Sequence, residues 1–146
     1  MQGAPCTSPQ GETMNEFIWS IRVYYEDIDA GGIVYHANYL KFMERARTEW
    51  LRDMGFEQTQ LKQQHNLIIV VRKISIDYFK PALFNDILYI KTHITQLGKA
   101  SMTMTQEVLR DAEILCTAVV KLAAINAINQ RPQALPPDII KALQQH

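Results

Sequence analysis

The chain has 146 residues, of which 47% are hydrophobic, and this size and composition fit one globular domain with a substantial core. Its 15 basic and 15 acidic residues balance, so no global charge attracts it to nucleic acid or to an acidic membrane surface. No apolar run approaches the roughly 20 residues that span a bilayer, and the first residues lack the pattern of a signal peptide. The sequence therefore predicts a cytoplasmic protein without a transmembrane segment and without nucleic acid as a partner.

The beginning of the chain differs from the rest in composition. Residues 1–15 are rich in Pro, Gly, Ser, Thr and Gln, which predicts a disordered tail before a single folded domain over residues 16–146. Cys6 lies in this tail, whereas Cys116 lies in an apolar pattern typical of a strand. Two cysteines in such different settings do not form a disulfide framework, so we expect reduced thiols.

The folded region is expected to begin with a strand and a long helix. Residues 18–25 carry alternating β-branched and aromatic side chains, which predict a strand, and residues 26–34 are expected to form a loop. From residue 38 to residue 54, apolar side chains recur every three or four positions, which predicts a helix. Gly55 is placed to end this helix in a left-handed conformation. The expected apolar face holds Leu40, Met43, Ala46 or Arg47, Trp50 and Met54.

Four further strands follow a polar segment, 58–66, that is expected to include a short helix. The strand patterns cover residues 67–78, 87–96, 101–109 and 114–125. The last pattern is almost entirely apolar, so we expect it to be buried on both faces. A short helix after Pro136 is expected near the end of the chain. This order predicts an α+β fold, with a single antiparallel sheet and helices on one face.

The segment between the first strand and the long helix carries the residues best suited to chemistry. Asp29 precedes Gly31 and Gly32, which can adopt backbone angles closed to other residues and let a ligand approach the main chain. The start of the following helix exposes unpaired N–H groups and a partial positive charge. A carboxylate beside such donors can attack, or activate water to attack, a carbonyl whose oxygen the donors hold. Asp29 can equally cap a turn, a common role of Asp before glycine.

This segment also resembles a known family. It carries the active-site signature of the 4-hydroxybenzoyl-CoA thioesterase family of hotdog-fold proteins in the form Asp27-x-Asp29-x-x-Gly32-Ile33-Val34-x-x-x-Asn38-Tyr39. The wider stretch 22–49 is similar to the Tol–Pal-associated acyl-CoA thioesterase branch of that family. Further matches lie at 70–73, 78–82 and 131–136, so the resemblance covers roughly residues 18–140 in order.

The resemblance implies a hotdog fold, an antiparallel five-stranded sheet wrapped around a long central helix. It also implies an acyl-CoA thioesterase, for which coenzyme A is part of the substrate and no separate cofactor is needed. Asp29 takes the position of the family's catalytic Asp, and His36 matches the histidine of the Tol–Pal-associated branch. The implied oxyanion and substrate-binding residues are Val34, Tyr35, His36, Asn38 and Tyr39, with the oxyanion donors being backbone N–H groups near Val34 to His36.

The sequence leaves more than one role for each of these side chains. Asp29 serves as nucleophile or as general base. Asp27 either raises the pKa of Asp29 or holds the loop by hydrogen bonds. His36 positions the substrate or water, protonates the leaving thiolate, or stabilises the helix start. Glu44 either pairs with Arg47 on the wet side of the helix or acts as a catalytic carboxylate, as a helical Glu does in another hotdog branch.

Basic side chains on the strands are candidates for the phosphates of coenzyme A. They are Arg72, Lys73 and Lys80, with Lys99 as a further candidate. The same residues also fit solvated strand edges and turns. The chain has no P-loop and no Gly-x-Gly-x-x-Gly motif, so the nucleotide is expected to bind on the surface. No metal site is expected, because thioester hydrolysis needs none and the remaining histidines lack ligand spacing.

Exposed strand edges and the resemblance both predict self-association. A sheet of this kind leaves edges that invite pairing, so we expect a homodimer through an edge strand. The resemblance adds active sites at the dimer interface and a dimer of dimers. Two rival functions remain: a binding or scaffold protein for acyl carrier protein, and a hotdog dehydratase. The dehydratase is disfavoured because the proline-rich segment around its histidine is missing.

Overall fold

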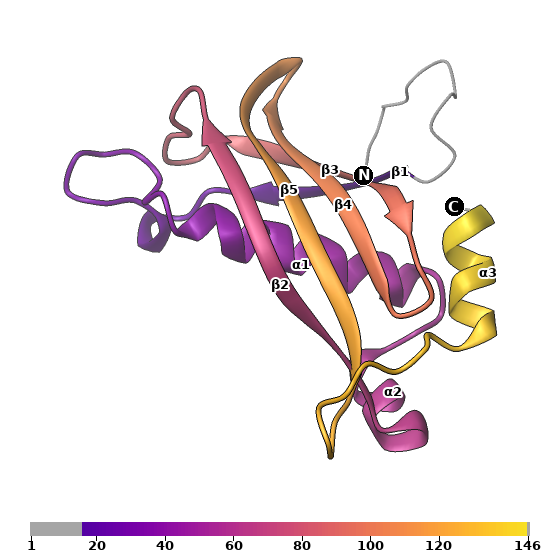
Figure 1. The fold of residues 1–146 in the computed structure, drawn as a ribbon. Coiled ribbons are helices and arrows are strands. Elements are labelled where there is room, and N and C mark those ends of the chain that lie inside the picture. The colour runs from indigo at the N-terminus through magenta and orange to yellow at the C-terminus, as the bar shows by residue number, and fades with distance from the viewer. Residues whose placement is uncertain (1–15, 146) are drawn as a thin grey trace.

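The computed structural model describes residues 16–145, which form five strands and the helices around them (Figure 1). The predicted tail, 1–15, lies outside the described residues, as does Cys6. The elements in chain order are β1 (Glu16–Arg22), η2 (Tyr25–Asp27), α1 (Asn38–Asp53), α2 (Gln58–His65), β2 (Leu67–Tyr78), β3 (Ile87–Leu97), β4 (Ser101–Arg110), β5 (Glu113–Asn126) and α3 (Pro137–Gln145).

The strands form one antiparallel sheet in the order β1-β3-β4-β5-β2. The consecutive strands β3, β4 and β5 are neighbours in the sheet, whereas β1 and β2 lie at its opposite edges. In Figure 1 the strands curve across α1, so the helix lies along one face of the sheet. The predicted α+β sheet wrapped around a long helix is therefore confirmed.

The core lies between α1 and the concave face of the sheet. The buried side chains of α1 are Asn38, Tyr39, Phe42, Met43, Ala46, Trp50 and Leu51. Leu88 and Ile90 on β3, and Met104 and Val108 on β4, are also fully or nearly fully buried. Their spacing of two positions on β3 and four on β4 matches the alternation expected for a sheet with one covered face.

Three predictions about these elements were wrong. The first strand ends at Arg22 and not at the expected Tyr25, which instead begins a 3-10 turn, Tyr25–Asp27. Leu40 is 38% exposed, because Tyr39, Phe42 and Ala46 satisfy the same helical period and face the sheet. Val119 of β5 is 42% exposed, because the helices of the chain cover only one face of the sheet.

The end of α1 and the β2 edge of the sheet each have an irregular backbone feature. Gly55 has a φ of 95° directly after α1, which confirms its predicted left-handed position. In β2 the register to β5 shifts between Val71 and Lys73, so Arg72 forms a bulge on the free edge of the sheet. None of the helices over residues 16–145 has the length and apolar character needed to cross a membrane.

A buried polar residue joins the helix to the sheet. Gln106 on β4 has no exposed surface, and its amide donates to the Met43 carbonyl of α1 at 3.0 Å and to the Thr92 hydroxyl of β3 at 2.9 Å. Its carbonyl oxygen accepts from Arg47 Nη1 at 2.9 Å. One side chain on β4 thus satisfies groups on α1 and on β3 and helps to set how α1 lies on the sheet.

We predict that Gln106→Leu lowers the free energy of unfolding by about 1–3 kcal/mol, because Arg47 and Thr92 lose their buried partner. Urea unfolding measures the change. Gln96→Leu is the matched control, because Gln96 is exposed on the neighbouring strand β3. Equal unfolding midpoints for the two variants would contradict the role given to Gln106.

Candidate active site

The loop between β1 and α1 folds back on itself through main-chain bonds. The Asp29 N–H donates to the Ile33 carbonyl at 2.9 Å, and the Gly32 N–H donates to the Asp29 carbonyl at 3.0 Å. Gly32 has a φ of 81°, a conformation that side-chain-bearing residues rarely adopt. The glycine predicted to permit a tight loop therefore does so, and it places Asp29 at the exposed rim of the fold.

Asp27 and Asn38 fasten this loop to the start of α1. The Asp27 carboxylate accepts from the Tyr24 N–H at 2.8 Å. The Asp27 carbonyl accepts from the Tyr35 N–H at 3.0 Å and from Asn38 Nδ2 at 2.9 Å. Of the two roles left open for Asp27, the geometry supports the structural one. Asn38 does not cap the helix, because Ala37 is the N-cap residue and the Asn38 side chain reaches back to the loop.

The Asp29 carboxylate combines a turn-capping bond with exposure. Its Oδ1 accepts from the Gly31 N–H at 2.8 Å, which is the capping role that the sequence allowed. Over the described residues, Oδ2 has no hydrogen-bond partner, and the residue is exposed. A carboxylate can accept several hydrogen bonds, so this contact orients Asp29 and leaves one oxygen available.

The N–H groups before α1 divide into those that hold the loop and those that are free. Val34 N–H donates to the Ala82 carbonyl at 2.9 Å, and Tyr35 N–H donates to the Asp27 carbonyl. Neither is therefore available to an oxyanion in this arrangement. Within residues 16–145, the N–H groups of His36 and Ala37 have no acceptor. They are the unpaired donors that a helix start presents.

A pocket of about 270 Å³ opens beside these donors, and we call it the His36 pocket. Its lining includes Val34, His36 and Tyr39, which were predicted to bind the oxyanion or the substrate, and Lys80, which was predicted to contact phosphate. Tyr35 is exposed and its ring lies 4.6 Å from that of His36, while Asn38 is buried beneath the loop. The full lining is Ile33, Val34, His36, Tyr39, Tyr78, Phe79, Lys80 and Pro81.

Two phenols form the floor and side of the His36 pocket. The Tyr78 hydroxyl donates to the His36 carbonyl at 2.8 Å, and the Tyr39 hydroxyl accepts from the Ala82 N–H at 3.1 Å. Burial raises the pKa of both phenols, and Cys116 adds to the effect. Both therefore stay protonated at neutral pH and fix the position of the helix start relative to β2.

The predicted phosphate-binding residues lie in different settings. Lys80 pairs with Glu113, which also pairs with Arg110 Nη2 at 2.9 Å. The pKa of Glu113 is lowered by its hydrogen bond to Lys80 and then by Arg110. Arg72 and Lys73 lie instead at the exposed bulge of β2, away from the His36 pocket lining. Lys73 is the cross-strand partner of Lys121 of β5, and among residues 16–145 neither lysine forms an ion pair. Sequence spacing alone did not reveal this like-charge pair.

Reasoning from the sequence missed Tyr78, Phe79 and Pro81 as pocket residues. They are about 40 positions from His36 in the chain, and only the matched segment 78–82 pointed to them. A pocket wall formed by two distant segments leaves no local spacing pattern.

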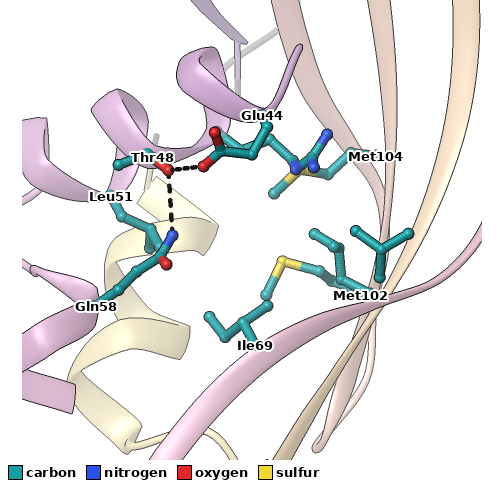
Figure 2. Close-up of a pocket in the computed structure, with 10 residues that line it drawn as sticks. Glu44, Thr48, Leu51, Gln58, Ile69, Met102 and Met104 are labelled. Atoms are coloured by element: carbon teal, nitrogen blue, oxygen red, sulfur yellow. Dashed lines mark hydrogen bonds between the residues drawn. The ribbon is translucent and has the colours of Figure 1, made fainter. Parts of the chain in front are cut away.

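A second pocket lies further along α1, and we call it the Arg47 pocket (Figure 2). Its volume is about 140 Å³. Glu44 accepts from the Thr48 hydroxyl at 2.6 Å, and Arg47 bonds to Gln106, so the predicted Glu44–Arg47 pair does not form as a direct ion pair. The lining is Glu44, Arg47, Thr48, Leu51, Gln58, Ile69, Val71, Met102, Met104 and Leu122.

Known proteins resemble this chain over most of its length. The profile of the thioesterase-like superfamily matches residues 23–143. Acyl-CoA thioesterase YbgC of Haemophilus influenzae is 41% identical over 125 residues, which cover 86% of this chain and 92% of that protein. Acyl-CoA thioester hydrolase YbgC of Escherichia coli O157:H7 is 42% identical over 130 residues, covering 88% of this chain and 96% of that protein. The crystal structure of a probable thioesterase from Bartonella henselae has a TM-score of 0.79 and 41% identity, covering 83% of this chain and 99% of the other.

The thiol behind the His36 pocket gives a direct check of its burial. Cys116 is the cross-strand partner of Tyr78, and burial raises its pKa to about 12. A raised pKa means that less thiolate is present at a given pH, roughly one molecule in ten thousand at pH 8. In a Cys6→Ser background, we predict that an aromatic disulfide reagent modifies Cys116 at least about 100-fold more slowly in the folded protein than in denaturant. Similar rates in the two states would show that this wall of the pocket is open.

Proposed function

The chain belongs to the thioesterase-like superfamily and has the hotdog fold, and we propose that it hydrolyses acyl-CoA thioesters to a free acid and coenzyme A. Two YbgC relatives named for this activity are more than 40% identical to it over most of both chains. The observation that carries the proposal is the arrangement of the Asp29 loop. An exposed carboxylate oxygen lies on a loop that leads directly to two unpaired N–H groups and an open pocket.

In the proposed reaction the thioester carbonyl lies in the His36 pocket. The N–H groups of His36 and Ala37 donate to the carbonyl oxygen as it gains negative charge, aided by the positive end of α1. Asp29 either attacks the carbonyl carbon to form a mixed anhydride, which water then cleaves, or takes a proton from water as water attacks. In both routes the C–S bond breaks and the sulfur leaves as the thiolate of coenzyme A. The His36 side chain can position water or protonate that thiolate.

The proposal assigns Val34 and Tyr35 a different role from the one first expected. Their N–H groups hold the loop to Ala82 and Asp27, and this supports the orientation of the donors that follow. Tyr39 and Asn38 act in the same way, from beneath the pocket. Coenzyme A is part of the substrate, so the proposal needs no cofactor and no metal ion.

For the phosphates of coenzyme A we favour the bulge of β2 over Lys80. Lys80 is already paired with Glu113, and breaking that pair would offset part of any gain from a phosphate. The charges of Arg72, Lys73 and Lys121 have no ion pair with a carboxylate among the described residues. Such a cluster attracts an anion, and Arg can bind phosphate through two N–H groups.

The free edge at β2 supports a homodimer, with a dimer of dimers as the larger form. β2 is hydrogen-bonded to β5 on one side only, and Val71 on this strand is 44% exposed. Pairing of β2 with its copy would continue the sheet and cover that edge. It would also bring two active-site regions close to one interface.

We predict that Asp29→Asn lowers thioester hydrolysis by roughly a hundredfold or more, because the variant lacks the charged oxygen that attacks or accepts a proton. Free-thiol release from short aliphatic, long aliphatic and aromatic acyl-CoAs measures it. Asp53→Asn, at the exposed end of α1, is the matched control and should retain activity. Undiminished turnover by a folded Asp29→Asn protein would remove Asp29 from the mechanism. Inactivity of the wild type on every acyl-CoA would favour a carrier-protein thioester or a binding role.

Self-association is tested separately. We predict a mass of at least twice the 16.8 kDa of one chain in sedimentation equilibrium at micromolar concentration. A charge placed on the free edge by Val71→Glu should shift the equilibrium toward the monomer, because it would be desolvated at the pairing edge. A monomeric wild type at micromolar concentration would contradict the proposed dimer.

A further inference from the structure

Hydrogen bonds hold the polar side chains on one side of the Arg47 pocket in place. Gln58 Nε2 donates to the Thr48 hydroxyl at 3.2 Å, and that hydroxyl donates to Glu44 Oε2 at 2.6 Å. Figure 2 shows this relay along the helical side of the space, with Ile69 and Met102 on the opposite side. The relay orients the Glu44 carboxylate and leaves its other oxygen able to accept a further bond.

Arg47 adds unused donors to the same pocket. Its guanidinium is half-buried, and its hydrogen bond to Gln106 occupies one of the five N–H groups that arginine carries. It forms no ion pair among residues 16–145. Burial lowers the pKa of Arg47, with the charge of Glu44 acting in the opposite direction. The remaining N–H groups of this half-buried cation are available to water or to a ligand.

The rest of the pocket suits the end of an apolar chain. Its sheet side is formed by Ile69, Val71, Met102, Met104 and Leu122. The volume of about 140 Å³ is about ten times the roughly 10–15 Å³ that one water molecule needs, so the pocket has room for a small chemical group. Arg47 follows His36 by roughly 11 residues, or about 16 Å along the helix axis. The Arg47 pocket is thus remote from the His36 pocket, which lies at the start of α1.

We propose that the Arg47 pocket receives the distal end of the acyl group and selects chains that end in a hydroxyl. This inference rests on the proposed thioesterase function and names its substrate class. A hydroxyl accepts from Arg47 and donates to Glu44, so it satisfies both groups at once. A terminal carboxylate would meet the negative charge of Glu44, a terminal amine would meet the positive charge of Arg47, and a methyl group would form a hydrogen bond with neither.

Matched substrates test the selection. Hexanoyl-, dodecanoyl- and hexadecanoyl-CoA are compared with their terminally hydroxylated counterparts by kcat/KM. For at least one chain length, the wild type should favour the hydroxylated substrate by roughly 10- to 100-fold, the effect of one charge-assisted hydrogen bond. Arg47→Met should bring this ratio close to one. Arg45→Met is the control, because Arg45 is exposed on the same helix, and its ratio should equal that of the wild type.

A ratio near one at every chain length in the wild type would overturn the inference, as would an unchanged ratio in Arg47→Met. If Arg47→Met does not fold, Arg47→Gln retains a donor for Gln106 but lacks the charge, and its ratio should also fall. The same substrate pairs are titrated onto Asp29→Asn by calorimetry, so the selection is measured as affinity without turnover. Equal affinities within every pair would also overturn it. Absence of hydrolysis by the wild type, with the affinity difference retained in Asp29→Asn, would count against the proposed function and support the pocket.

Discussion

The contact between the apolar face of α1 and the concave face of the sheet determines where every other part of the site lies. Hydrophobic burial alone leaves a helix free to shift or turn on an apolar surface, because it has no direction. Gln106 removes that freedom, since its amide bonds to the Met43 carbonyl and its carbonyl oxygen accepts from Arg47. The start of α1 is therefore held against the Asp29 loop, and Arg47 is held at the second pocket.

The loop before α1 is built mainly from main-chain bonds, and this explains how it presents a reactive carboxylate in a defined position. Asp27 and Asn38 close the loop from inside, and Gly32 permits its turn. The bonds that hold the loop use the N–H groups of Val34 and Tyr35, and within residues 16–145 those of His36 and Ala37 have no acceptor. The bonds that hold the loop thus also select which donors at the helix start remain unpaired. Electrostatic stabilisation depends on such groups being in place before the substrate arrives.

The charged residues near the two pockets differ in whether they form ion pairs. Lys80, Arg110, Asp86 and Glu113 form a paired network that holds the turn behind the His36 pocket. Among residues 16–145, Arg47 and the cluster at the β2 bulge form no ion pair, and Arg47 is half-buried beside a pocket. Paired charges at the surface contribute little beyond local order. The spare N–H donors of Arg47, next to an apolar wall, are the physical reason to connect the Arg47 pocket with a ligand.

The sequence by itself determined the elements and the main chemical candidate. Hydrophobic periodicity is a local property, so the helix over residues 38–53 and the strands from Leu67 onward were predictable nearly to their ends. The left-handed Gly55 and the turn-capping bond of Asp29 before two glycines followed from the same local rules. The matched signature added the hotdog arrangement, which periodicity could not supply because it says nothing of strand order.

Only the tertiary structure decided which groups meet. Leu40 and Tyr39 fit the helical period equally well, and contact with the sheet selected Tyr39. The pairing of Lys80 with Glu113, and of Arg47 with Gln106, joins segments 33 and 59 residues apart, and no local pattern encodes such distances. The division of helix-start donors into bonded and free ones likewise depends on the Ala82 carbonyl, which a distant strand connection brings to Val34. Side-chain roles at a site are set by neighbours in space, and those neighbours exist only once the chain has folded.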